Sequence, residues 1–215
     1  PHIIGEWTYT TASNDKTLSG KSGKFTCLAT AVDNHGPVIV KDRYYFEYAD
    51  GKPYYPFGTT CYAWTHQGEA LEAKTLETLS AAPFNKIRMC VFPKRYNYNK
   101  NEPEFYPFEL ISKKDSPDEK GTFVWDYTRF NPAFFKHLEN RIKDLMDLGI
   151  EADLILFHPY DEGHWGFDRM SHETDIVYLK YLLSRLSSYR NIWWSLANEY
   201  DFMEEKKYEV WEDFI

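Results

Sequence analysis

The feature that most constrains the fold is the alternation of short apolar segments with amphipathic segments after residue 54. The amphipathic segments carry Leu, Ile or Phe at helical spacing, whereas the apolar runs are nearly continuous, as in strands buried on both faces. Asn131 followed by Pro132 is a typical helix start, and Gly149 is a typical helix end. The predicted strands are 54–60, 86–92, 152–157 and 192–197, and the predicted helices are 68–81, 131–149, 174–189 and 204–215.

This order of elements predicts about four β/α units, and therefore a parallel sheet covered by helices. An open doubly wound sheet is the alternative, but no glycine-rich phosphate loop follows the first predicted strand. We therefore predict an α/β fold: a parallel (β/α) barrel that is incomplete, with half the units of a (β/α)8 barrel. Half a barrel has two open sheet edges and an uncovered apolar interior, so we expect self-association through these edges.

The chain before residue 49 has a different character. Short strands are expected at 6–11, 23–31 and 37–48, separated by turns rich in Ser, Asn, Gly and Lys, and a tight turn is expected at 49–52. We predict that residues 1–48 are a β-rich segment, either the tail of a β-sandwich or an N-terminal extension. Residues 49–215 are predicted to be the N-terminal half of the barrel.

Composition excludes several kinds of partner. The net charge of −8 argues against nucleic acid, and no apolar stretch is long enough for a membrane span. Three widely spaced cysteines form neither a disulfide framework nor a zinc motif, and as buried thiols they favour a reducing, cytoplasmic compartment. The chain starts at Pro1 without a signal-peptide pattern, so we expect its natural N-terminus to be missing. The aromatic content of 18% fits a sugar-facing surface or an aromatic core, and composition favours the core.

The last predicted strand ends in the pair Asn198-Glu199, and carboxylates at the C-terminal ends of barrel strands carry acid/base chemistry. Glycoside hydrolysis needs one carboxylic acid to protonate the leaving oxygen and a second carboxylate as nucleophile or base. Asn198 could bind a sugar hydroxyl, but both side chains can face one site only if the strand bulges or ends there. The alternative for Glu199 is a solvated carboxylate that caps the next helix.

Arg88 and His158 are further candidates for substrate binding. Arg88 interrupts an apolar strand, and an unpaired buried cation is costly, so it should pair with a carboxylate, for which Glu199 is a candidate. The alternative is a purely structural ion pair. His158 follows the third predicted strand, where it could bind a sugar or simply bond a backbone carbonyl.

The loops on the same face are rich in aromatic residues. We expect stacking on a sugar from some of Trp64, Trp125 and Trp165, although loop tryptophans often pack beneath their own loop. His66 and Tyr160 lie in the same loops and are further substrate-binding candidates. The insert at 93–130 is interpreted as a wall of the substrate cleft, since long loops are usually functional or disordered. Its aromatic residues are Tyr96, Tyr98, Phe105, Tyr106, Phe108, Phe123 and Trp125.

Several acidic residues and histidines cluster after the third predicted strand, but their spacing matches no metal motif. We therefore predict neither a metal nor a cofactor. The cluster is interpreted as a polar loop, and its members are His158, Asp161, Glu162, His164, Asp168 and His172.

At this point the chain resembles a known group of enzymes. The run at 193–199 resembles the fourth strand of clan A glycoside hydrolases, which ends in an Asn-Glu pair. The segments 46–60, 84–88 and 198–201 resemble the apiosidase-like branch of bacterial barrel glycosidases, and the resemblance covers roughly residues 35–215. It implies a (β/α)8 barrel, in many members preceded by a β-sandwich, that hydrolyses a plant or microbial glycan with retention and without a metal.

Position by position, the resemblance makes Glu199 the general acid/base and Asn198 the residue that binds the sugar 2-hydroxyl. Arg88 matches the second-strand Arg near the nucleophile, and His158 falls near a third-strand His of some members. Clan members have a nucleophilic Glu at the end of the seventh strand, and no strand is predicted here after the fourth. No nucleophile can therefore be named, and we expect the chain alone to be inactive. The sugar, linkage and anomer stay open.

Two alternatives from other classes remain at this stage. One is a non-catalytic carbohydrate-binding barrel that kept the aromatic cleft. The other is a metal-dependent barrel isomerase.

Overall fold

The computed structural model describes residues 3–95, 100–114, 122–161 and 163–215. Its central sheet has four parallel strands in the order β11-β10-β7-β6. The sheet is open, with β6 and β11 at its edges, which confirms the predicted incomplete (β/α) barrel. Self-association through these edges stays a prediction. The strands are β6 (Gly58–Thr60), β7 (Lys86–Cys90), β10 (Glu151–Phe157) and β11 (Ile192–Ala197).

Four helices follow the four strands, close to the predicted positions. Asn131 accepts a hydrogen bond from the Ala133 amide and Pro132 opens the second helix, so the predicted start signal is used as expected. Gly149 adopts a left-handed φ of 72° just after that helix. The helices are α1 (Glu69–Ser80), α2 (Pro132–Asp147), α3 (His172–Leu186) and α4 (Tyr208–Phe214).

The prediction of one strand over 54–60 was wrong. Tyr54 belongs to β5 (Pro53–Tyr54), which pairs with β4 (Tyr45–Tyr48), whereas β6 starts only at Gly58. Pro56 lies between the two strands and has no N–H for a ladder hydrogen bond. A Cβ on Gly58 would lie 3.0 Å from the Lys86 carbonyl oxygen, so glycine permits the close approach of β6 to β7.

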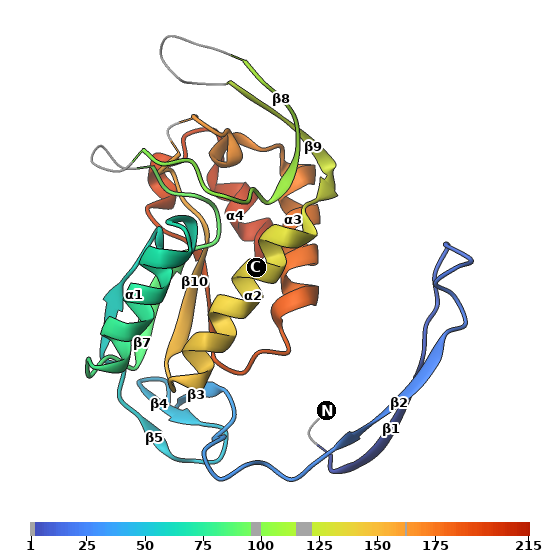
Figure 1. Cartoon of the computed structure of the whole chain (residues 1–215), viewed down its shortest axis with the longest axis vertical. Coiled ribbons are helices and arrows are strands. Elements are labelled where there is room, and N and C mark those ends of the chain that lie inside the picture. Colours follow the sequence, from blue (N-terminus) through green and yellow to red (C-terminus); the bar gives the residue numbers. More distant parts are fainter. Residues whose placement is uncertain (1–2, 96–99, 115–121, 162) are drawn as a thin grey trace.

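The N-terminal part forms two small antiparallel sheets. The hairpin of β1 (Gly5–Thr10) and β2 (Ser22–Cys27) extends away from the rest of the chain (Figure 1). The predicted strand at 37–48 divides into β3 (Val38–Lys41) and β4, because Asp42 and Arg43 adopt left-handed φ values of 49° and 70°. The β4–β5 pairing crosses residue 48, where the sequence predicted a boundary.

The sheet of β3, β4 and β5 packs against the N-terminal end of the barrel strands. Phe46 and Tyr54 contact Trp193 of β11, with ring centroids 4.9 and 5.8 Å apart. Glu151, at the start of β10, is buried nearby, and burial raises its pKa to about 7 against the opposing charge of Arg190. This end of the barrel is therefore filled by aromatic side chains and a carboxyl group.

The 93–130 insert contains a hairpin that the sequence did not predict, formed by β8 (Phe108–Lys113) and β9 (Phe123–Phe130). Two register irregularities interrupt the pairing, which weakens the strict alternation of a strand pattern. Tyr96 and Tyr98 of the insert lie outside the described residues.

The inner face of the half-barrel is polar, contrary to the predicted apolar interior. Lys86 Nζ lies 2.9 Å from an Asp153 carboxylate oxygen and 3.8 Å from the centroid of the Trp193 ring. Arg88 donates to Ser195 Oγ over 3.0 Å, and its Nε lies 3.9 Å from Asp153. Charged groups from neighbouring strands neutralise one another here, which lowers the cost of placing them inside the sheet.

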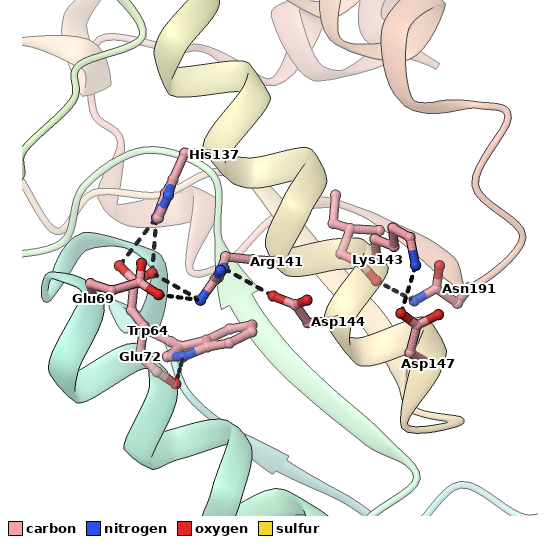
Figure 2. A network of polar contacts seen from close by, with 10 residues as sticks. Trp64, Glu69, Glu72, His137, Arg141, Lys143, Asp144, Asp147 and Asn191 are labelled. Atoms are coloured by element: carbon pink, nitrogen blue, oxygen red, sulfur yellow. Dashed lines mark hydrogen bonds and ion pairs between the residues drawn. The ribbon is translucent and has the colours of Figure 1, made fainter.

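A buried carboxylate joins α1 to α2. Glu72 of α1 is almost fully buried, and its Oε2 lies 2.9 Å from His137 Nε2 and 3.7 Å from Arg141 Nη1 (Figure 2). Trp64 donates its indole N–H to the Glu72 carbonyl oxygen over 3.2 Å. The hydrogen bond to Glu72 raises the pKa of His137, and burial opposes that rise less strongly.

The His137–Glu72 contact predicts a pH-dependent stability. Because the folded state raises the pKa of His137, the stabilisation is complete below the unfolded value of about 6.5 and is lost as pH rises through the raised value. We expect His137→Gln to lower the free energy of unfolding by about 1.5–3 kcal/mol at pH 5.5 and by clearly less at pH 9, in urea titrations. His172→Gln is the control, since His172 pairs with the exposed Asp213. Equal losses at both pH values would contradict the prediction.

Glu151 predicts an effect of the same sign at the other end of the sheet. Its folded pKa of about 7 lies above the ordinary value, so stability falls as pH rises from about 4.5 towards 7 and above. We expect Glu151→Gln to unfold at higher urea concentration than the parent at pH 8, with little difference at pH 4.5. Glu109→Gln is the control, because Glu109 is exposed and pairs with Arg129. A destabilised Gln variant at pH 8 would show that the charged form is the favoured one.

Candidate active site

The pair Asn198-Glu199 directly follows β11, which ends at Ala197. The backbone N–H of Asn198 donates to the Phe157 carbonyl oxygen at the end of β10 over 3.1 Å. Glu199 then adopts a left-handed backbone, with φ 49° and ψ 48°, a conformation that is uncommon for a non-glycine residue and concentrates at functional sites. Because the strand ends before this pair, strand alternation does not force the two side chains onto opposite faces.

Glu199 is exposed and precedes the short helical turn η3 (Tyr200–Phe202). Its side chain makes no capping hydrogen bond to that turn within the described part of the chain. The alternative interpretation as a helix cap therefore lacks its defining contact. The carboxylate stands at the C-terminal end of the sheet, where a substrate can reach it.

Asn198 contacts the loop after β10 through its side chain. The amide Nδ2 donates to the hydroxyl of Tyr160. The Tyr160 ring stacks on Tyr62, with centroids 5.8 Å apart and an interplanar angle of 18°, and on His158 at 5.1 Å and 19°. Loops after three different strands thus meet beside the Asn-Glu pair.

Lys94, from the loop after β7, lies over this aromatic stack. Its Nζ is 3.4 Å from the centroid of the Tyr160 ring and 4.9 Å from that of Tyr62, which is cation–π geometry. Burial lowers the pKa of Lys94, and the negative charge of Glu199 opposes that change. Burial raises the pKa of Tyr160, and the negative charge of nearby Glu199 raises it further, so the phenol keeps its proton at neutral pH.

His158 is a buried structural residue, which corrects its prediction as a sugar-binding group. Its Nε2 lies 3.0 Å from the Phe92 carbonyl oxygen, and its Nδ1 accepts the Tyr160 amide over 3.2 Å. Burial lowers the pKa of His158 to about 4, so the ring is neutral, with its proton on Nε2. With both nitrogens occupied, the imidazole orients Tyr160 instead of a ligand.

Arg88 does point into the barrel and does pair with a carboxylate, but its partner is Asp153. The prediction of Glu199 as its partner is corrected by these contacts, because Asp153 is the β10 residue in register with Arg88. Residues in register on adjacent parallel strands lie side by side, so Arg88 meets Asp153 in the middle of the sheet and not the residues at its C-terminal end.

Trp64, Trp125, Trp165 and His66 are all buried in the core, which corrects their prediction as substrate-binding groups. A stacking platform needs one exposed ring face, and at most 6% of each residue is exposed. Trp125 donates its indole N–H to the Trp165 carbonyl oxygen over 2.7 Å, and His66 Nε2 lies 3.2 Å from the Val91 carbonyl oxygen. Trp125 belongs to β9, so it is not a loop residue.

Glu102 is a structural carboxylate that the sequence did not single out. It accepts hydrogen bonds from Trp165 Nε1 and the Tyr106 hydroxyl, each over 2.8 Å, and lies 2.7 Å from His164 Nε2. Burial alone would raise its pKa, but these hydrogen bonds outweigh burial and lower the pKa to about 2. Glu102 thereby ties the insert to the loop after β10.

Sequence reasoning also passed over Tyr62 and Lys94, although both follow strand ends that it had marked as functional. A lysine and a tyrosine in loops carry no distinctive spacing signal. Their proximity depends on the order β11-β10-β7-β6, which places loops from separate parts of the chain side by side.

No group of three or more His, Cys, Asp or Glu in the described residues is placed to hold a metal ion. Asp161 instead accepts hydrogen bonds from the amides of Gly163 and Phe167, over 2.5 and 2.8 Å, and shapes its own loop. Burial, together with its hydrogen bond to Asp161, raises the pKa of Asp168 to about 8. Glu162 lies outside the described residues.

Of the helices in the described ranges, none is both long and apolar enough to cross a bilayer.

Comparison with known protein families identifies the family of this chain. The family described as "Apiosidase-like, catalytic domain" matches residues 40–215. The chain belongs to the apiosidase-like catalytic domain family. This confirms the resemblance inferred from the Asn-Glu strand end, and it relates the chain to glycoside hydrolases.

Among solved structures, one from Bacteroides vulgatus is described as a candidate glycoside hydrolase. It is 50% identical to this chain with a TM-score of 0.94, and the match covers 100% of this chain and 42% of the other chain. A family 5 glycoside hydrolase from the same organism is 17% identical with a TM-score of 0.56; the match covers 84% of this chain and 36% of the other chain and supports the fold alone. This apiosidase-like chain therefore spans less than half the length of these structures. No curated protein matches.

Proposed function

We propose that this chain carries the acid/base part of the active site of a retaining glycoside hydrolase that acts on a plant or microbial glycan. The observation that carries the proposal is the position of Glu199: exposed, in a left-handed turn at the C-terminal end of β11, beside Asn198, in an apiosidase-like chain. Carboxylates in this position are the catalytic groups of barrel enzymes.

Glu199 would first protonate the glycosidic oxygen as that bond breaks, and would later take a proton from the attacking water. Asn198 donates its side-chain Nδ2–H to the Tyr160 hydroxyl, and in this proposal its side-chain carbonyl oxygen would accept a hydrogen bond from a sugar hydroxyl. Arg88 contacts Asp153 and Ser195 on the inner face of the sheet, and in this proposal the nucleophile would lie near it.

The nucleophile belongs to another part of the barrel in this proposal. A retaining mechanism needs a second carboxylate about 5–5.5 Å from the first, on the opposite side of the sugar ring. The carboxylates that follow Glu199 in the sequence lie in η3, α4 and the segment between them, and none of these follows a further barrel strand in the described residues. We therefore expect this chain alone to lack turnover.

The test uses a polypeptide that contains this chain together with the strands that complete the barrel. We expect Glu199→Gln to reduce hydrolysis of aryl glycosides by about 100- to 10,000-fold, because the leaving oxygen loses its proton donor. Asp201→Asn, two residues away in η3, is the matched control and should keep the parent rate.

Two results would contradict the proposal. Full activity of Glu199→Gln would remove Glu199 from the mechanism. Sugar binding in calorimetry without turnover in the complete barrel would favour a non-catalytic carbohydrate-binding protein instead.

A further inference from the structure

We propose that Lys206, paired with the buried Asp175, is a positioning residue that holds Glu199 in its left-handed turn. The inference rests on the proposed function of Glu199 and deepens it, because it names the contacts that fix the carboxylate in place. Lys206 lies between η3 and α4, and Asp175 lies in the first turn of α3.

The side chain of Lys206 ends in polar contacts inside the protein. Its exposed fraction is 4%, and that of the Asp175 side chain is 0%. The ammonium group donates to Asp175 Oδ2, and to the Met170 carbonyl oxygen over 3.0 Å. Its Nζ also lies 5.6 Å from the centroid of the Phe157 ring at the end of β10. Lys206 is therefore fixed both to the loop that follows β10 and to the start of α3.

A buried ion pair of this kind is a poor source of net stability. Taking two charges out of water costs about as much as their attraction returns, and well-packed apolar residues of similar size often serve equally well. The pair does impose a definite geometry, because the ammonium group keeps its two hydrogen bonds only in one place. Its effect should therefore lie in the segment that it anchors.

Three backbone hydrogen bonds connect this anchor to Glu199. The Phe202 amide donates to the Glu199 carbonyl oxygen over 3.0 Å. The Met203 amide donates to the Tyr200 carbonyl oxygen over 3.0 Å, and the Met203 carbonyl oxygen accepts the Lys206 amide over 2.8 Å. Met203 is itself buried in the core. The segment 199–206 is thus a series of closed turns, through which a displacement of Lys206 is passed on to Glu199.

The carbonyl group of Lys206 provides a second connection. It accepts the indole N–H of the buried Trp211 over 3.2 Å. The Trp211 ring makes edge-to-face contacts with Tyr200 and Phe157, with centroids 5.9 and 5.8 Å apart. Tyr200 directly follows the Asn-Glu pair, and the Phe157 carbonyl oxygen accepts the backbone N–H of its first member. One tryptophan therefore connects Lys206 with two neighbours of the pair.

Glu199 needs such support because of its backbone conformation. A left-handed non-glycine residue is strained and persists only where the surrounding structure fixes it. β11 ends at Ala197, and the exposed side chain of Glu199 contributes little packing of its own. Asn198 holds the turn from one side and Lys206 from the other. If Glu199 is the proton donor, a displacement of about 1 Å would lower the rate about 100-fold.

The kinetic test uses the complete barrel and separates position from stability. The double variant Asp175→Leu/Lys206→Met removes both charges together, so no unpaired charge stays in the core. We expect it to unfold at nearly the parent urea concentration. We expect its kcat to fall by about 10- to 100-fold, with KM changed far less, because the proton donor loses its position while the sugar contacts remain.

Asp175→Asn is the conservative variant with the opposite expectation. Its side-chain oxygen can still accept the Lys206 N–H, so the anchor keeps its geometry, while the buried cation loses its counter-charge. The urea midpoint should fall, whereas kcat should lie well above that of the double variant, within about threefold of the parent. A purely structural ion pair would leave the kcat of the folded protein at the parent value in both variants.

The matched control is Arg185→Met/Glu139→Leu. Arg185 also pairs with a carboxylate of a neighbouring element, Glu139 of α2, but it lies in the last turn of α3, at the opposite end from Asp175. This variant should keep the parent kcat. If the Leu variant does not fold, Asp175→Asn/Lys206→Met takes its place with the same kinetic expectation, since it removes the same Lys206 bonds without adding volume.

Two kinetic results would overturn the inference. One is the parent kcat in the double variant. The other is a loss of kcat in Asp175→Asn as large as the loss in the double variant, since the conservative change would then fail to rescue the position of Glu199.

A second measurement needs only this chain and no activity. In hydrogen exchange followed by NMR, the amides of Phe202 and Met203 should exchange at least about 10-fold faster in the double variant, because they close the turns after Glu199. The Arg185→Met/Glu139→Leu control should leave these two rates unchanged. Parent exchange rates in the double variant would overturn the inference even if the complete barrel proved inactive.

The same experiments distinguish this inference from the proposed function. An active barrel that requires Glu199 but keeps its rate in the double variant would overturn the inference alone. Full activity of Glu199→Gln would overturn the proposed function, and the positioning role of Lys206 with it.

Discussion

The structure depends on the pairing of β10 with β7 on one side and β11 on the other. All residues of β10 are buried, which is the condition under which a parallel strand is stable, since both of its faces need cover. The helices supply that cover on the outer face: Tyr178 of α3 donates to the Leu156 carbonyl oxygen over 3.1 Å. The side-chain Nδ2 of Asn191, just before β11, donates a hydrogen bond to the Ile142 carbonyl oxygen of α2 over 3.0 Å.

The candidate active site follows from the register of that pairing. Phe157 and Ala197 are partners at the ends of β10 and β11, so the residues that follow them leave the sheet together. Tyr160 and Asn198 meet for this reason, and Lys94 joins them because β7 lies on the other side of β10. The opposite end of the sheet has a structural character, with Trp193 packed on Phe46 and Tyr54. The structural contacts and the candidate active site thus lie at opposite ends of the strands, the arrangement that is usual in barrel enzymes.

Much of the fold could be predicted because its signals are local. The cap at Asn131, the glycine at 149 and the helical spacing of the apolar residues all act within one or two turns of chain, and the helices start and end within a few residues of the predicted places. The first barrel strand was misplaced because 54–60 contains no charged residue that would mark a break, and its division at Pro56 depends on pairing with two different sheets. The β8–β9 hairpin was missed because its irregular register hides strand alternation.

By itself, the sequence determined the α/β class, the incomplete barrel and the place of Asn198 and Glu199 at a strand end, because these patterns are formed by residues that are neighbours in the sequence. Only the tertiary structure decided which of the aromatic residues face solvent and which charges meet. The core contains Trp64, Trp125 and Trp165, and Arg88 pairs with Asp153. Tyr160 contacts Asn198, and Lys94 lies over the Tyr160 ring. Burial and pairing across strands depend on register between distant segments, which no local pattern encodes.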